Sequence, residues 1–295
     1  MKNILKFIWT MAAVLIFTGC SDENKVESES SSSDKEILAT SEGHSSTRTQ
    51  VGGIAGDGCL KMQWLSHENI GVFSNTGEIT KFSSHNDTPS DWASFKGTMN
   101  GEPQKAYYPY DNTVSSSIIP VNIPALQNYK DVSSIAPYDY KAATSIEQRT
   151  LGYYRMSFRQ MVTIVCMNID LSMFPQLEKN EKLSKIEMVG NTNLAGTYTY
   201  DLNNLDAGLT PEAASNSVAV SFVNNPMLSG ALTAYMIVAP GSQAGSEYTF
   251  NITTDKHTLT FKTNLLVTLE AGKFYNLPIN TEILTKNNVV VNAII

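Results

Sequence analysis

The sequence predicts an all-β fold, mainly because apolar residues recur at every second position. Val218, Val220 and Phe222 alternate with small or polar residues, and turn-forming clusters separate this run from its neighbours. No window of about 15 residues shows convincing 3.6-residue spacing. The clearest helical candidate, residues 174–183, is short and contains Pro175. Short strands separated by turns are typical of β-sandwiches.

The first twenty residues have the order of an export signal. Lys2 and Lys6 precede an apolar run over residues 7–17, and small residues follow up to Cys20. This order is similar to bacterial lipoprotein signals, in which the cysteine is lipidated and cleavage leaves it first. The apolar run is shorter than the ~20 residues that span a bilayer. We therefore interpret residues 1–19 as a signal peptide and Cys20 as the lipid attachment point, which places the protein at the outer membrane.

Residues 20–48 are predicted to be a flexible acidic tether. The segment is rich in Ser, Glu and Asp, and within residues 21–48 Ile37-Leu38 is the only adjacent apolar pair. The acidic stretch at 21–24 resembles the surface-export signal of Bacteroidetes lipoproteins, which implies a surface-exposed protein.

Strand patterns continue from the end of the tether to the end of the sequence. The longest runs over residues 154–169. From Tyr154 to Cys166 its even-numbered positions form an apolar face on which Gln160 is the one exception. Residues 232–238 are apolar on both faces except for Thr233, as in a central strand. A weakly patterned polar stretch ends near residue 150, so we expect one β-sandwich at 49–150 and a second at 151–295.

Composition and motifs argue against several function classes. The chain has 295 residues and a formal net charge of -7, a sign that does not suit phosphate neutralisation, so no nucleic-acid partner is expected. It contains no G-x-S-x-G, P-loop or H-E-x-x-H motif. The four histidines are scattered, so we expect no metal, no cofactor and no catalytic residues. A disulfide between Cys59 and Cys166 is possible after export, but their spacing does not require one.

Several loose motifs occur in an order that resembles the fimbrillin family of Bacteroidales, the subunits of type V pili. In the first half they are Ser46-Thr47-Arg48-Thr49, Trp64, Asn69-Ile70-Gly71-Val72-Phe73, Trp92-Ala93-Ser94-Phe95-Lys96-Gly97, Ala106-Tyr107-Tyr108-Pro109-Tyr110, and Ile123-Pro124 through Gln127. In the second half they are Met156-Ser157-Phe158-Arg159-Gln160-Met161, Met236-Ile237-Val238-Ala239-Pro240 and Leu269-Glu270-Ala271-Gly272-Lys273-Phe274-Tyr275.

The resemblance implies two tandem transthyretin-like β-sandwiches that assemble into a surface fimbrium by β-strand exchange. In that family an arginine-specific protease cuts near the end of the tether, the first strand leaves, and a strand of a neighbouring fimbrial subunit replaces it. Arg48 and Thr49 flank the candidate cleavage point. The alternative is an uncut anchored lipoprotein in which Arg48 is structural. A ligand on a host or bacterial surface is a further implied partner.

The C-terminal segment 287–295 is either a donor strand or the last strand of the second sandwich. Its alternating pattern suits an extended peptide that completes a sheet edge. The candidate donor residues are Val289, Val291, Ala293 and Ile295 on one face, and Val290, Asn292 and Ile294 on the other.

A surface glycan-binding lipoprotein is the alternative function. Sugar recognition uses exposed aromatic rings beside polar groups, and Tyr107, Tyr108 and Tyr110 could supply such rings. Packing of these tyrosines in the core is the competing interpretation, because large aromatic residues dominate sandwich cores.

Overall fold

The computed structural model describes residues 32–41, 50–54, 60–287 and 289–294. Strands dominate this part of the chain, together with one short α-helix and two 3-10 segments. The predicted all-β class is confirmed. The predicted helical candidate at 174–183 is not a helix, because residues 172–180 form turns.

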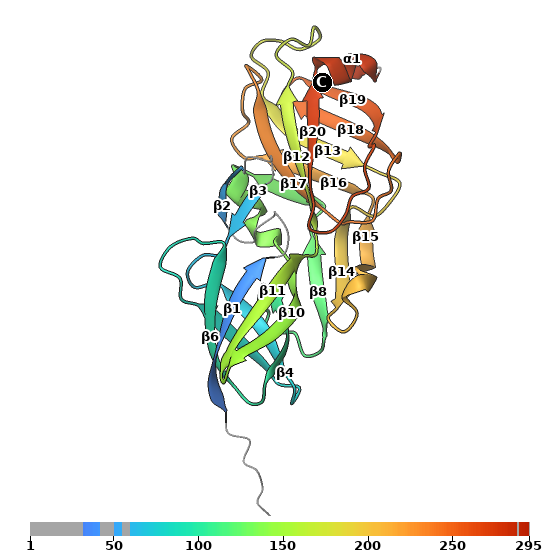
Figure 1. Ribbon diagram of the computed structural model, residues 1–295. Helices are drawn as coiled ribbons and strands as arrows, with labels where there is room; N and C mark the ends of the chain where they lie inside the picture. Colours follow the sequence, from blue (N-terminus) through green and yellow to red (C-terminus); the bar gives the residue numbers. More distant parts are fainter. Residues whose placement is uncertain (1–31, 42–49, 55–59, 288, 295) are drawn as a thin grey trace, which may run out of the picture. The chain divides into compact units, whose positions relative to one another are not determined.

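Seven strands close into a barrel in the order β1-β11-β10-β7-β4-β5-β6 (Figure 1). Their bounds are β1 (Ser33–Ser41), β4 (Asn69–Ser74), β5 (Ile79–Ser84), β6 (Trp92–Met99), β7 (Pro103–Tyr108), β10 (Lys141–Thr150) and β11 (Tyr153–Gln160). A separate two-stranded ribbon pairs β2 (Gln50–Ile54) with β3 (Leu60–Gln63). Because a closed barrel leaves no free strand edge, every barrel strand is hydrogen-bonded on both sides.

The remaining strands form three sheets. The first has the order β17-β12-β20, with β17 (Leu232–Val238), β12 (Thr163–Asp170) and β20 (Phe274–Asn280). The second has the order β21-β19-β18-β13-β16-β9, with β21 (Val290–Ala293), β19 (His257–Asn264), β18 (Glu247–Thr254), β13 (Leu183–Val189), β16 (Ser217–Phe222) and β9 (Leu126–Tyr129). The third has the order β15-β14-β8, with β15 (Leu209–Ser215), β14 (Ala195–Asp201) and β8 (Ile118–Ile123). The helical segments are η1 (Val132–Tyr138), η2 (Leu205–Ala207) and α1 (Thr281–Lys286).

The barrel core is built around Trp64. Its ring makes near-perpendicular contacts with Phe95, Tyr108 and Phe158, at centroid distances of 5.0, 5.3 and 5.6 Å. Edge-to-face packing of this kind is a favoured aromatic geometry. The buried ammonium of Lys141 lies 4.6 Å from the Trp64 and Tyr108 ring centroids and forms an ion pair with the buried Asp139.

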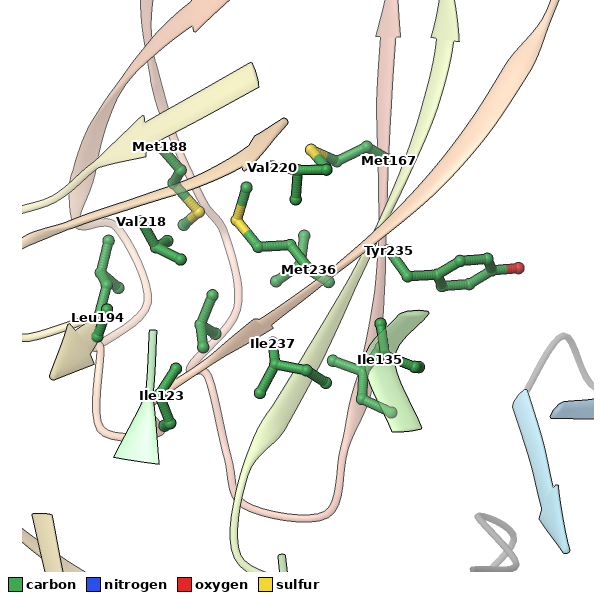
Figure 2. Packing of buried hydrophobic residues seen from close by; sticks show 14 of the residues in the cluster. Ile123, Ile135, Met167, Met188, Leu194, Val218, Val220, Tyr235, Met236 and Ile237 are labelled. Carbon is green, nitrogen blue, oxygen red and sulfur yellow. The ribbon is translucent and has the colours of Figure 1, made fainter. Parts of the chain in front are cut away.

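A second, larger core is formed mainly by the sheets that contain β12, β17, β13 and β16 (Figure 2). Met236 of β17 and Val220 of β16 are completely buried in it. Ile123 of β8 and Ile135 of η1 belong to the same cluster, although both precede residue 150. Segments from both halves of the sequence therefore build one core.

The strands do not divide at residue 150, where the sequence placed a domain boundary. β10 and β11 pair across this point, with Thr150 opposite Tyr153. β8 pairs with β14, and β9 pairs with β16, so strands of the expected first domain complete sheets of the expected second domain. The described residues from Ser32 onward accordingly group into one compact unit. Alternation within strands does not reveal which strands pair, so these pairings could not be predicted from the sequence.

Two strand predictions also need correction. The run at 154–169 is two strands, β11 and β12, which are interrupted at Met161 and Val162. The segment 232–238 is a strand, β17, but its backbone pairs only with β12 among the described residues, so it lies at a sheet edge. Its burial on both faces comes from packing with other elements, which the pattern could not distinguish from a central position.

Candidate functional site

The segment 33–41 is a barrel strand, which corrects the prediction of a flexible tether over 20–48. β1 lies between β6 and β11, antiparallel to the first and parallel to the second (Figure 1, the dark blue strand). It therefore forms a backbone ladder on each side, although the rest of the barrel follows only after residue 60.

The inward face of β1 is buried. Ile37 and Ala39 are fully buried, and Ile37 lies opposite Phe95 of β6 and Tyr154 of β11. Burial of an isoleucine side chain contributes about 1.5–3 kcal/mol. The apolar pair Ile37-Leu38 was the sequence signal for this strand, but its acidic and Ser-rich surroundings concealed it.

The outward face of β1 contributes polar contacts to β6. Thr98 Oγ1 donates to Asp34 Oδ1 at 2.6 Å, and Ser94 Oγ donates to Glu36 Oε1 at 2.6 Å. These contacts fix the register of β1 against β6 in addition to the backbone ladder.

Lys35 is the cation on the inward face of β1. Its side chain is 5% exposed, and its ammonium lies 2.9 Å from Glu102 Oε1 and 6.0 Å from the Tyr154 ring centroid. Sequence reasoning did not single out either residue of this ion pair, because a lysine in a polar segment reads as a solvated side chain.

The predicted lipidation and processing residues lie outside the described part of the chain. Cys20 precedes β1, whereas Arg48 and Thr49 fall between β1 and β2. In the sequence, Cys20 and β1 therefore both precede Arg48.

The C-terminal segment forms an edge strand. β21 pairs antiparallel with β19, from Thr260 opposite Val290 to His257 opposite Ala293. Val289 and Val291 are half-buried against the larger core, whereas Val290 and Ile294 are exposed. The described residues thus show the last-strand arrangement for this segment. The remaining candidate donor residues are Asn292 and Ala293, which are exposed, and Ile295, which lies outside the described residues.

The three tyrosines of the glycan alternative do not form a common exposed platform. Tyr107 is 2% exposed and packs in the larger core, whereas Tyr108 is 6% exposed and packs in the barrel core. The Tyr107 hydroxyl donates to the Asp111 carbonyl at 2.9 Å, and burial raises the pKa of Tyr107 to about 12. Tyr110 is half-buried and, with Tyr107, lines a pocket of about 580 Å³. The arrangement of Tyr107 and Tyr108 is that of core residues.

Other candidate chemistry is sparse within the residues that the structure describes. They contain no group of His, Cys, Asp and Glu residues arranged for a metal ion. They also contain no helix long and apolar enough to cross a membrane. Cys166 is buried without a disulfide partner among these residues, and burial raises the pKa of its thiol to about 11. Cys59 lies outside the described residues.

Comparison with known proteins gives the family. The fimbrillin-like family model matches residues 60–295, so the chain belongs to the fimbrillin-like family. Membership of this family makes the protein a fimbrial-type structural protein and not an enzyme.

Two solved structures share the fold. A protein from Bacteroides uniformis assigned to cell adhesion is 15% identical with a TM-score of 0.53, and the match covers 89% of this chain and 96% of that one. A second such protein, from Bacteroides ovatus, is 13% identical with a TM-score of 0.55, over 90% and 97% of the two chains. No curated protein matches the chain significantly.

Proposed function

We propose that this protein is a fimbrial subunit that is exported as an outer-membrane lipoprotein through Cys20 and assembles by β-strand exchange. The position of β1 carries the proposal. It is a buried strand within the barrel and is hydrogen-bonded on both sides. The next barrel strand along the chain is β4, which begins only at Asn69, and the candidate cleavage point lies between the two strands.

Cleavage after Arg48 would turn β1 into a separate peptide held only by non-covalent contacts. Its departure would expose the ladder groups of β6 and β11 and the apolar residues beneath Ile37 and Ala39. Such a groove can accept an extended strand through main-chain hydrogen bonds and side-chain pockets. An unfilled groove would be prone to aggregation, which favours replacement of one strand by another.

The released strand and the anchor would stay together, because Cys20 and β1 precede Arg48 in the sequence. The cleaved chain from Thr49 onward would then be free to enter a surface fibre. The segment 289–295 is the candidate donor strand. Because β21 lies at an edge and its side chains are largely exposed, its transfer to another subunit would disturb the remaining sheet less than loss of a central strand. Donor and acceptor sites differ, so the contact would propagate as a filament. Other fimbrial subunits are the expected partners, with a host or bacterial surface ligand at the exposed part of the fibre.

The test uses a non-lipidated chain that starts after Cys20. It is treated with an arginine-specific protease and followed by mass spectrometry and negative-stain electron microscopy. We expect one early cut after Arg48, loss of the β1 peptide and the appearance of polymers. The Arg48→Ala variant should remain intact and monomeric. Polymers that form equally well from this variant would contradict the role of the cleavage. A cut chain that retains β1 under conditions that polymerise known pilins would contradict strand exchange.

A further inference from the structure

The inward face of β1 combines a cation, a large apolar residue and a small residue. In order along the strand these are Lys35, Ile37 and Ala39, and all three side chains are buried. Ala39 lies opposite Ala93 of β6 and Met156 of β11. Any strand that takes the place of β1 must therefore offer matching chemistry at three alternate positions.

Glu102, the partner of Lys35, belongs to the barrel and not to β1. It lies in the turn between β6 and β7, where its backbone N–H donates to Asn75 Oδ1 at 3.0 Å and its carbonyl accepts from the Asn75 N–H at 2.9 Å. These bonds do not involve β1. The Glu102 backbone would therefore keep its place if β1 departed, and its carboxylate would still border the vacated position.

The Glu102 carboxylate depends on a cation from the strand beside it. Oε1 contacts the Lys35 ammonium, and Oε2 is buried without a hydrogen-bond partner among the described residues. A neutral residue in place of Lys35 would again cover the carboxylate but leave both oxygens without a donor, which costs free energy. Because the Glu102 side chain is 40% exposed overall, water moderates this cost.

We propose that the barrel selects an incoming strand that carries Lys or Arg at the position of Lys35, so that its preferred donor is another subunit and not a second copy of this chain. This inference rests on the strand-exchange function proposed above. It assigns Glu102 as the residue whose carboxylate favours a donor strand with a positively charged side chain at this position.

The C-terminal segment of the chain itself lacks the required cation. Only one alignment in the direction of β1 places its small residue at the small position: Ala293 then replaces Ala39, and Val291 replaces Ile37. Val289 consequently takes the place of Lys35. A second copy of this chain would fit the two apolar positions but leave Glu102 without a positive partner.

The experiment measures which peptides displace β1. The chain after Cys20 is prepared with residues 42–48 replaced by the site of a sequence-specific protease, so that the result does not depend on natural cleavage at Arg48. After cleavage, a labelled β1 peptide (residues 32–41) is bound and displaced by unlabelled peptides of residues 287–295. Three versions are compared by fluorescence polarisation, namely the natural sequence, Val289→Lys and Val289→Met. The methionine peptide controls for the longer aliphatic stem.

We expect the Val289→Lys peptide to displace β1 at about a tenfold lower concentration than the natural or Val289→Met peptides. In the Glu102→Gln variant this preference should fall to about twofold or less, whereas the exposed control Glu147→Gln should preserve it. Equal displacement by the lysine and methionine peptides, or a preference that survives Glu102→Gln, would overturn the charge selection while leaving strand exchange intact. Failure of every peptide, including unlabelled β1 peptide, to exchange would instead overturn strand exchange itself and the inference with it.

Discussion

At the scale of single residues, Gln127 takes over the hydrogen-bonding role of a neighbouring strand. It is 3% exposed, and its side-chain amide bonds both backbone groups of Ile237 in β17. Nε2 donates to the Ile237 carbonyl at 2.7 Å, and Oε1 accepts from the Ile237 N–H at 2.9 Å. A buried sheet edge would otherwise leave these groups unsatisfied. This amide therefore satisfies one pair of buried backbone groups at the edge of β17.

We predict that Gln127→Ala lowers the free energy of unfolding by about 2–4 kcal/mol, because two buried backbone groups of Ile237 lose their partners. Urea denaturation followed by circular dichroism measures the change. Asn128→Ala, at an exposed position of the same strand, is the control and should have little effect. A loss for Gln127→Ala no greater than that of the control would contradict the capping role.

Burial of Tyr198 predicts a loss of stability in alkaline solution. Burial raises the pKa of this tyrosine from its ordinary value of 10.0 to about 12, and its hydroxyl donates to the Ala195 carbonyl at 3.1 Å. The unfolded chain ionises near the ordinary value, so this stabilisation is present below about pH 10 and is lost as the pH rises toward 12. Tyr198→Phe should make the free energy of unfolding fall less steeply between pH 10 and 11.5 than in the wild type. Identical slopes in guanidinium titrations at these pH values would count against the assignment.

Residue patterns predicted some of these features and missed others. Gln160 interrupted an apolar face in the sequence, and in the structure its Nε2 donates to Asp139 Oδ1 at 2.6 Å in a buried setting. The partners of Gln127 and Lys35 could not be predicted, because each contact joins segments that lie far apart in the sequence. Local alternation contains no information on such pairings.

At the scale of secondary-structure elements, β1 shows how tertiary context overrides composition. The segment 21–48 is too polar to order itself, and the prediction of a tether followed from that property. The strand forms because β6 and β11 supply a complete ladder on both sides and an apolar surface below. The strand at 247–254 was predictable, because its burial alternates strictly along the chain. In the strand at 217–222 the buried Val218, Val220 and Phe222 follow the alternation, although Ala219 between them is buried as well.

We predict that Ile37→Ala weakens the attachment of β1 more than Leu38→Ala does. Ile37 is fully buried in the barrel core, whereas Leu38 is half-buried on the opposite face of the strand. Ile37→Ala should cost about 2–4 kcal/mol, as for other buried large-to-small changes. Hydrogen exchange of the β1 backbone amides, measured by mass spectrometry, should accelerate accordingly. Equal acceleration in both variants would show that the inward apolar contact does not hold β1.

At the scale of the whole molecule, family membership and the topology support one another. The fimbrillin-like match covers residues 60–295, and β1 lies before the matched region although it completes the barrel. Strand exchange requires a strand that is part of the barrel but that a single cut in the chain can separate from the other barrel strands. The sequence predicted the family and the all-β class from motif order and alternation, but the shared core of the two halves depends on β8 and β9, whose pairing no local pattern specifies.

The most direct test of this account is the intact mass and N-terminal sequence of the protein taken from the cell surface. Strand exchange after cleavage predicts a chain that begins at Thr49, carries no lipid and lacks the β1 segment. A surface protein that begins at an acylated Cys20 and retains residues 33–41 would contradict cleavage and leave β1 as a permanent strand of an anchored lipoprotein.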